Sequence, residues 1–289
     1  MNRLITIVFV IALANSFSFS QNGSKPCTFN DFKFSEYLVN NQLYHDALLH
    51  SSLIDFSGCS HSDSLWFLKG WSQYNLKQLD SASFSFLKVK ENKAILNKSK
   101  FFAAYCYAHI GKLDSAFTVI NSISPINNDE KELITTQLSG FSLLNRNLSS
   151  FNLFSKNFSE SHFGLVENQR TLKSLYTDLD EFKLKSPLIA GLLSAAVPGL
   201  GKVYAGKLGS GLSSFLTVGI AGVMTYENYA KNGLNNPKTI IFGSLFSILY
   251  VANIYGSVFS IKAYRDEFNQ QIDYRILFHL HIPIRNLYN

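Results

Sequence analysis

The sequence has few charged residues and no motif that would mark an enzyme. Only 16% of its 289 residues are Asp, Glu, Lys or Arg, which is low for a water-soluble protein, whereas 46% are hydrophobic. It contains no Walker phosphate loop, no G-x-S-x-G elbow and no H-E-x-x-H zinc motif. The basic residues form no cluster, so the net charge of +6 does not indicate nucleic-acid binding. We therefore expect no enzymatic activity, no cofactor and no nucleic-acid partner.

Cysteine is also scarce, and its three positions predict one disulfide and one free thiol. The apolar run Leu4–Ala14 follows a basic residue and precedes a small polar end, which predicts a cleaved signal peptide over residues 1–20; an uncleaved anchor is the alternative. Export would place the cysteines in an oxidising compartment. Cys27 precedes the first predicted helix and Cys59 follows the second, so both lie at one end of an antiparallel hairpin and can form a disulfide. Cys106 is expected to stay reduced.

Two uncharged runs predict membrane-spanning helices. Thr239–Ile261 has 23 residues and Gly209–Tyr226 has 18, and about 20 residues cross a hydrocarbon core of about 30 Å. Two buried helices of a soluble protein are the alternative. A third apolar stretch, Leu188–Leu200, has only 13 residues. We expect it to cross as well, which gives three spans and a C-terminus opposite the N-terminal domain. If it is re-entrant, the C-terminus returns to the side of that domain.

A run rich in glycine and proline interrupts this membrane region. It reads Pro198-Gly199-Leu200-Gly201-Lys202-Val203-Tyr204-Ala205-Gly206-Lys207, and its proline and glycines should break a helix. The run resembles the P-G-x-G-x-x-Y-x-G signature of a small bacterial family of two-helix membrane domains, in which Gln usually stands at the place of Lys202. The resemblance implies a compact inner-membrane module over residues 186–263, with no established reaction. The matching residues are Pro198, Gly199, Gly201, Tyr204 and Gly206.

An internal repeat precedes the membrane region. Leu79-Asp80-Ser81-Ala82 recurs 34 residues later as Leu113-Asp114-Ser115-Ala116, and weaker copies flank the pair at a spacing of 35 residues. With Tyr107 and Gly111, the second copy resembles the core of a tetratricopeptide repeat, whose glycine permits a tight turn between two helices. We therefore predict four helical repeats over residues 28–158.

The repeat frame predicts which side chains line a concave groove, the surface that such arrays commonly use for binding proteins. These are Phe67, Trp71, Tyr74, Asn75, Phe101, Tyr105 and His109. Aromatic side chains offer a large contact area at low entropic cost, which favours a protein partner. In the alternative, a capping and connecting helix within residues 159–185 folds back and buries the groove as core.

The C-terminal tail, residues 264–289, is expected to begin as a polar helix and to continue as a strand-like or interfacial segment, because apolar residues alternate after Asp273. His279 and His281 would then share one face. Two histidines without a carboxylate or thiolate partner do not predict a metal site.

Together these patterns predict an all-α protein with a helical-repeat solenoid and a C-terminal transmembrane module. We expect it in the bacterial inner membrane, with its repeat domain in the periplasm. Its predicted function is to recruit a protein partner to the lipid bilayer. The alternative is a membrane module that assists protein insertion or envelope transport.

Overall fold

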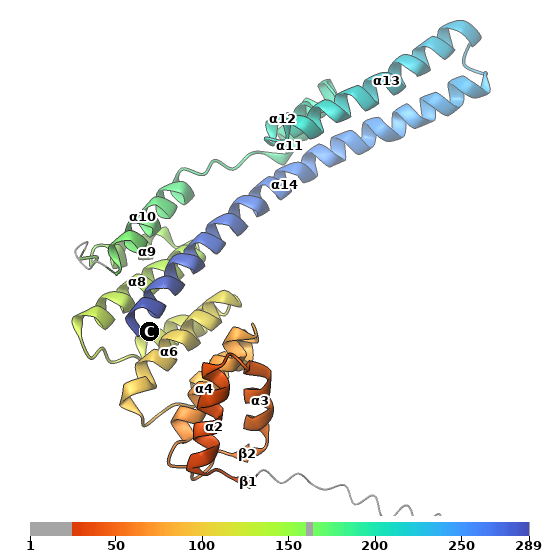
Figure 1. The fold of residues 1–289 in the computed structure, drawn as a ribbon. Helices are drawn as coiled ribbons and strands as arrows, with labels where there is room; N and C mark the ends of the chain where they lie inside the picture. Colours follow the sequence, from red (N-terminus) through yellow and green to blue (C-terminus); the bar gives the residue numbers. More distant parts are fainter. Residues whose placement is uncertain (1–24, 160–163, 289) are drawn as a thin grey trace, which may run out of the picture.

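The computed structural model describes residues 25–159 and 164–288, so the predicted signal peptide lies outside the described residues. The described chain is mainly helical, with two strands of two residues each. A domain of paired helices leads into a long helical hairpin, and the last helix runs back from the hairpin into the first domain (Figure 1).

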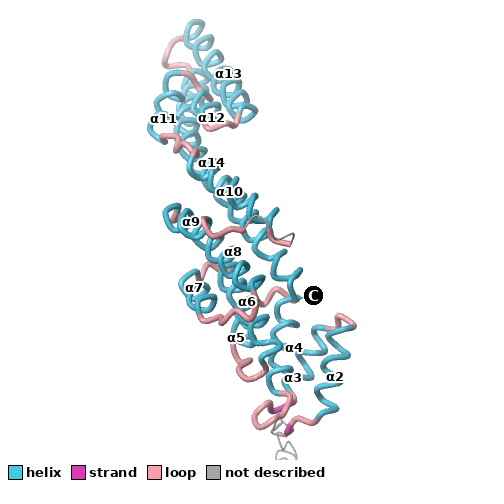
Figure 2. The backbone as a smooth tube through the Cα atoms, turned by 90° about the vertical axis from the view of Figure 1, so that its left-hand side faces the viewer, coloured by secondary structure: helices cyan, strands magenta, loops and turns pink. Residues whose placement is uncertain are grey.

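Four helical hairpins follow one another, and each packs on the next (Figure 2). Their helices are α2 Phe29–Asn40 and α3 Tyr44–Ser52, α4 Ser62–Asn75 and α5 Leu79–Phe86, α6 Lys93–His109 and α7 Leu113–Asn121, and α8 Asn128–Leu144 and α9 Leu148–Ser155. Small residues allow the two helices of a hairpin to approach: Cβ on Gly70 would lie within 2.8 Å of the Phe86 ring. Phe86, Phe102 and Phe141 are completely buried in the core of this domain.

All four hairpins turn in the same way. Gln42, Lys77, Gly111 and Arg146 have positive φ angles of 61°, 62°, 79° and 56°, and they recur every 34 or 35 residues. In each turn, the residue after the one with positive φ donates its backbone N–H to the carbonyl five positions earlier. Lys112 donates to Tyr107 in this way, and Asn147 donates to Ser142. This is the Schellman pattern that satisfies the last carbonyl groups of a helix. Gly111 thus has the turn role predicted for it.

The start of the domain is tied together covalently and by backbone hydrogen bonds. Cys27 and Cys59 form the predicted disulfide with a Cα–Cα distance of 5.9 Å. Strand β1, Lys25–Pro26, pairs in parallel with β2, Ile54–Asp55. This pairing requires extended backbone after Ser52, which is where α3 ends.

Residues 164–288 form five helices: α10 Val166–Asp180, α11 Pro187–Ala196, α12 Leu200–Tyr204, α13 Leu208–Asn232 and α14 Pro237–Tyr288. Helix α10 packs on α8, α9 and α14. Among the described residues, α13 and α14 are the two helices long and apolar enough to cross a membrane. Helix α11 has ten residues and is about 15 Å long, which is half of a hydrocarbon core.

Helix α14 continues for 52 residues without a break, so the prediction of a strand-like tail was wrong. Ile272, Ile276, Leu280 and Ile284 are buried, and residues spaced by four lie on one face of a helix. A strand would bury Phe278 together with Ile276 and Leu280, because residues two apart lie on one face of a strand. Phe278 is instead 48% exposed. Pro283 lies inside the helix, where its missing N–H removes one backbone hydrogen bond.

Contacts at the base of the module support the re-entrant alternative for the α11–α12 segment. Before the segment, Lys185 Nζ lies 4.3 Å from the ring centroid of Tyr264. After it, Lys207 Nζ lies 2.8 Å from Glu267 Oε1. Tyr264 and Glu267 lie on adjacent turns of α14. The chain therefore enters and leaves the α11–α12 segment at about the same height along α14. The expected third span is therefore replaced by a short loop of two helices, and the C-terminus lies beside the repeat domain (Figure 1).

Candidate functional site

The main candidate site is the groove of the repeat domain, and the chain's own C-terminal segment occupies it. The last part of α14 packs against α6, α8 and α10. Ile276, Leu280 and Ile284 are completely buried there. Gly140 in α8 makes room for this contact, since a Cβ at that position would overlap the side chain of Leu280. The arrangement is that of an amphipathic helix bound in an apolar groove.

Polar contacts fix the position of the C-terminal segment along the groove. The Tyr74 hydroxyl and His281 Nε2 are hydrogen bonded, and the His281 ring stacks on Tyr105 with centroids 5.0 Å apart. On the opposite side, Gln137 Nε2 donates to the backbone carbonyl of Leu280 at 2.8 Å. Leu280 lies one helical turn before Ile284, the residue that follows Pro283. Its carbonyl is therefore next to the part of the helix that the proline interrupts.

The end of the segment is held by a second set of contacts. Lys98 Nζ donates to the Tyr288 carbonyl at 2.8 Å, and the Tyr288 hydroxyl donates to Glu130 Oε1 at 2.7 Å. Glu130 is buried and also accepts from Asn97. Lys98 Nζ also lies 5.2 Å from the ring centroid of Phe67 in the groove. The Lys98 ammonium group therefore contacts both the groove and Tyr288 of α14.

The structure places the seven predicted groove residues as follows. Tyr74, Phe101 and Tyr105 are buried, Phe67, Trp71 and Asn75 are half-buried, and His109 is exposed. Tyr74, Phe101 and Tyr105 contact His281 or Tyr288 of α14. The groove is therefore covered from within the chain, as in the self-capping alternative, although the covering helix is the C-terminal one rather than the predicted 159–185 segment. Asn75 only donates to the Trp71 carbonyl of its own helix.

Burial determines the protonation states in the groove. It raises the pKa of Tyr105 to about 12 and raises that of Tyr74 further. It also lowers the pKa of His281 to about 4, with smaller effects from the charges of Arg285, Lys77 and His109. A neutral imidazole can accept the proton of the Tyr74 hydroxyl in a hydrogen bond. The groove thus binds a neutral His281.

His279 and His281 do not share a face, because residues two apart on a helix point in different directions. His279 Nδ1 is 3.0 Å from Asn168 Oδ1 on α10, whereas His281 faces Tyr74. In the described part of the chain, no group of three or more His, Cys, Asp or Glu side chains could hold a metal ion. Cys106 is a buried free thiol, and burial raises its pKa to about 12.

The second candidate site is the P-G-x-G run, whose glycines close the re-entrant loop. Gly199 has φ +89° and Gly206 has φ +86°. A Cβ on Gly199 would overlap the Gly211 carbonyl of α13, and one on Gly201 would overlap the Ala190 carbonyl of α11. Half-buried Pro198 precedes this turn, and the Tyr204 hydroxyl accepts a hydrogen bond from the backbone N–H of Ser186.

Side chains of α11 and α14 satisfy the backbone groups freed by this turn. Asn253 Oδ1 accepts from Gly199 N at 3.1 Å, and Ser194 Oγ accepts from Gly201 N at 2.9 Å. The Ser194 and Ser257 hydroxyls are 2.6 Å apart. Irregular backbone at membrane depth is tolerated only where such partners exist. The polar side chains of Ser194, Asn253 and Ser257 therefore bind one another and the turn.

Sequence reasoning missed His281, Tyr288, Leu280 and Gln137 as groove residues. The four-residue spacing of apolar positions from Ile272 was the signal that could have identified the helix. Comparisons with known protein families, curated proteins and solved structures give no match for this chain. The two motif resemblances thus stay predictions.

Proposed function

We propose that the protein is a membrane-anchored scaffold that recruits a protein partner through tetratricopeptide-like repeats on the periplasmic side of a bacterial inner membrane. The observation that carries the proposal is the continuity of α14, which passes from an apolar hairpin into the groove of the repeat domain. A single helix bound at both ends holds the domain in a fixed position relative to the bilayer. The Cys27–Cys59 disulfide supports an oxidising compartment.

The partner surface that we propose is the first hairpin, which lies beyond the reach of α14. Tyr37 on α2 is 58% exposed and Leu49 on α3 is 65% exposed, and Phe29 and Phe34 of α2 are also largely exposed. Large apolar side chains grouped on one small element are typical of interaction surfaces. The predicted groove residues could receive a partner only if the C-terminal segment left the groove.

Insertion or transport, the alternative function, would need polar groups facing a cavity in the bilayer. Ser194, Asn253 and Ser257 are instead bonded to one another and to the re-entrant turn. Lys202 Nζ donates to Ser214 Oγ at 2.6 Å. These contacts favour a structural role for the module, and the scaffold is the function that we retain.

The test is position-specific photocrosslinking of the full chain in native membranes. A photoreactive residue at Tyr37 or Leu49 should give one discrete protein adduct, whereas one at Leu153, which is 64% exposed on α9, should not. Tyr37→Ser combined with Leu49→Ser should remove the adduct of a probe placed at Phe34, and Leu153→Ser should leave it. An adduct from Leu153 alone, or none from the first hairpin, would contradict the proposed surface. Adducts that appear in the groove only after Leu280→Ala would support groove docking instead.

A further inference from the structure

A pocket lies at the base of the membrane module, apart from the groove of the repeat domain and next to Tyr204 of the P-G-x-G run. It has a volume of about 650 Å³ and is formed by the connection between α10 and α11 and by α14 from Tyr255 to Arg265. Its apolar wall contains Tyr255, Val258 and Phe259, and its basic rim contains Lys185, Lys262 and Arg265. It is therefore apolar at one end and basic at the other.

The position of this pocket coincides with the end of the uncharged run of α14. Ile261 is the last residue of that run, and Lys262 and Arg265 follow within one helical turn. Tyr255 and Phe259 are 73% and 67% exposed on the side of the apolar run. If α14 crosses a bilayer, the apolar wall lies among acyl chains and the basic rim lies among headgroups.

The three cations of the rim have no acidic partner within ion-pair distance in the described part of the chain. Glu267, the nearest glutamate along α14, is bonded to Lys207, and neither Glu267 nor Asp266 lines the pocket. The ring of Tyr264 holds Lys185 in place, with Nζ 4.3 Å from its centroid. At the other end of the module, by contrast, Lys231 is paired with Glu227.

We propose that this pocket binds an anionic phospholipid. The phosphate accepts hydrogen bonds from Lys185, Lys262 and Arg265, and the acyl chains lie on Tyr255, Val258 and Phe259. Basic pockets at the ends of membrane helices attract anionic headgroups, and hydrogen bonds between cations and phosphate are stronger than neutral ones. A water-soluble anion would leave the exposed apolar wall uncovered, so a lipid satisfies both halves of the pocket. The bound lipid would join the α10–α11 connection to α14 beside the repeat domain.

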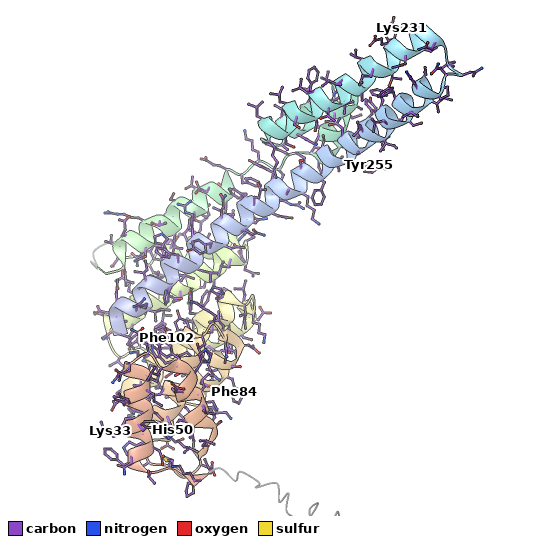
Figure 3. The ribbon with its side chains drawn as sticks, turned by 45° about the vertical axis from the view of Figure 1, so that its right-hand side comes forward. Lys33, His50, Phe84, Phe102, Lys231 and Tyr255 are labelled. Carbon is purple, nitrogen blue, oxygen red and sulfur yellow. A yellow bond between two sulfur atoms is a disulfide. The ribbon has the colours of Figure 1, made fainter. Side chains whose placement is uncertain are left out.

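The test measures lipid binding to the full chain, purified in detergent and delipidated, by native mass spectrometry and by thermal shift. Phosphatidylglycerol should bind and raise the Tm, and phosphatidylcholine with the same acyl chains should bind at least tenfold more weakly. Replacing Lys185, Lys262 and Arg265 together by Gln should remove this preference. Lys231→Gln, at the opposite end of the module (Figure 3), combined with Lys238→Gln, at the start of α14, should keep it.

Several results would overturn the proposal. Equal binding of the two lipids by the wild type, or an unchanged preference in the triple variant, would show that the rim does not select a headgroup. An equal Tm shift with inorganic phosphate would show a site for a soluble anion. If the triple variant fails to fold, Phe259→Ala provides a second measurement, since loss of the acyl contact should weaken phosphatidylglycerol binding without changing the response to phosphate. Unchanged lipid binding in that variant would exclude the apolar wall.

Discussion

Four turn residues have left-handed backbone conformations, and only Gly111 adopts its conformation without a steric cost. Gln42, Lys77 and Arg146 occupy the same position in the other hairpins, although residues with a Cβ are disfavoured there. The packing of each helix pair therefore imposes the turn on whatever residue stands in it. This is why the repeat spacing could be predicted from the sequence, whereas three of its turns carried no glycine signal.

Substitutions at these positions should change stability with opposite signs. No atom lies within 4 Å of a Cβ built on Gly111, so Gly111→Ala should lower the free energy of unfolding by about 1 kcal/mol through backbone strain alone. Gln42→Gly should raise it by about 0.5 kcal/mol, because it removes the same strain. Chemical denaturation of the full chain in detergent measures both. A loss of stability in Gln42→Gly would show that the turn is not strained.

His281 should make docking of the C-terminal segment dependent on pH. Its folded-state pKa of about 4 lies below the ordinary value of about 6.5, so between these values the unfolded state binds more protons. The stabilisation of the folded state by neutral His281 is complete above pH 6.5 and is lost as the pH falls towards 4. The charged or titratable groups around the ring are Tyr74, Tyr105, Lys77, His109 and Arg285.

The expected result is a Tm that falls between pH 7 and pH 4.5, with a smaller fall in His281→Gln. The effect should be on the order of 1 kcal/mol, because the ring is only half-buried and solvent screens part of it. His45→Gln changes an exposed histidine on α3 and should follow the wild-type profile. Identical pH profiles for His281→Gln and the wild type would contradict this assignment.

At the scale of elements, the C-terminal tail shows where sequence patterns become ambiguous. Ile276, Leu280 and Ile284 satisfy a period of two and also a helical spacing of four. Only packing distinguishes the two, since the groove buries the helical stripe and leaves Phe278 exposed. Pro283 also made the helical pattern hard to recognise, because proline usually interrupts a helix. The aromatic groove could be predicted from the repeats, but its occupant comes from almost 200 residues away in the sequence.

The close contact between α8 and α14 should appear as energetic coupling. Leu280→Ala should cost about 2–5 kcal/mol by leaving a cavity, and Gly140→Ala about 1–3 kcal/mol by overfilling the contact. The added methyl can occupy the space left by Leu280, so the double variant should be more stable than the sum of the two changes predicts. Strict additivity, measured by denaturation of all four proteins, would show that the two residues do not contact each other.

The first hairpin should depend on its disulfide. The bond joins residues separated by 32 positions, and chain entropy predicts a stabilisation of about 3–4 kcal/mol. Replacing Cys27 and Cys59 by Ser should lower the stability of the domain by about that amount. In the denatured, unreduced wild type, a thiol reagent should label Cys106 alone. Labelling of three cysteines in protein taken from its native membrane would contradict the bond and the exported location.

At the scale of the whole molecule, two rules for orientation make opposite predictions. The re-entrant loop brings Lys185, Lys207, Lys262 and Arg265 to the end of the module that faces the repeats, and the positive-inside rule would place this end in the cytoplasm. The predicted signal peptide and the Cys27–Cys59 disulfide place it outside. We favour export, because the first hydrophobic segment usually determines topology. Under that orientation the basic residues need another role, which lipid binding provides.

Topology can be tested with single cysteines introduced at exposed positions and a membrane-impermeant maleimide. Ser57→Cys in the repeat domain and Arg285→Cys near the end of α14 should be labelled from the same side of the membrane. Asn235→Cys, in the turn between α13 and α14, should be labelled from the opposite side, because each of these helices crosses once. Cys27, Cys59 and Cys106 give little background, since two are bonded and one is buried. Labelling of Arg285→Cys from the side opposite Ser57→Cys would restore the three-span topology and would be incompatible with α14 in the groove. If all three positions were labelled from one side, neither α13 nor α14 would cross, and the apolar hairpin would have to be covered by another protein rather than by lipid.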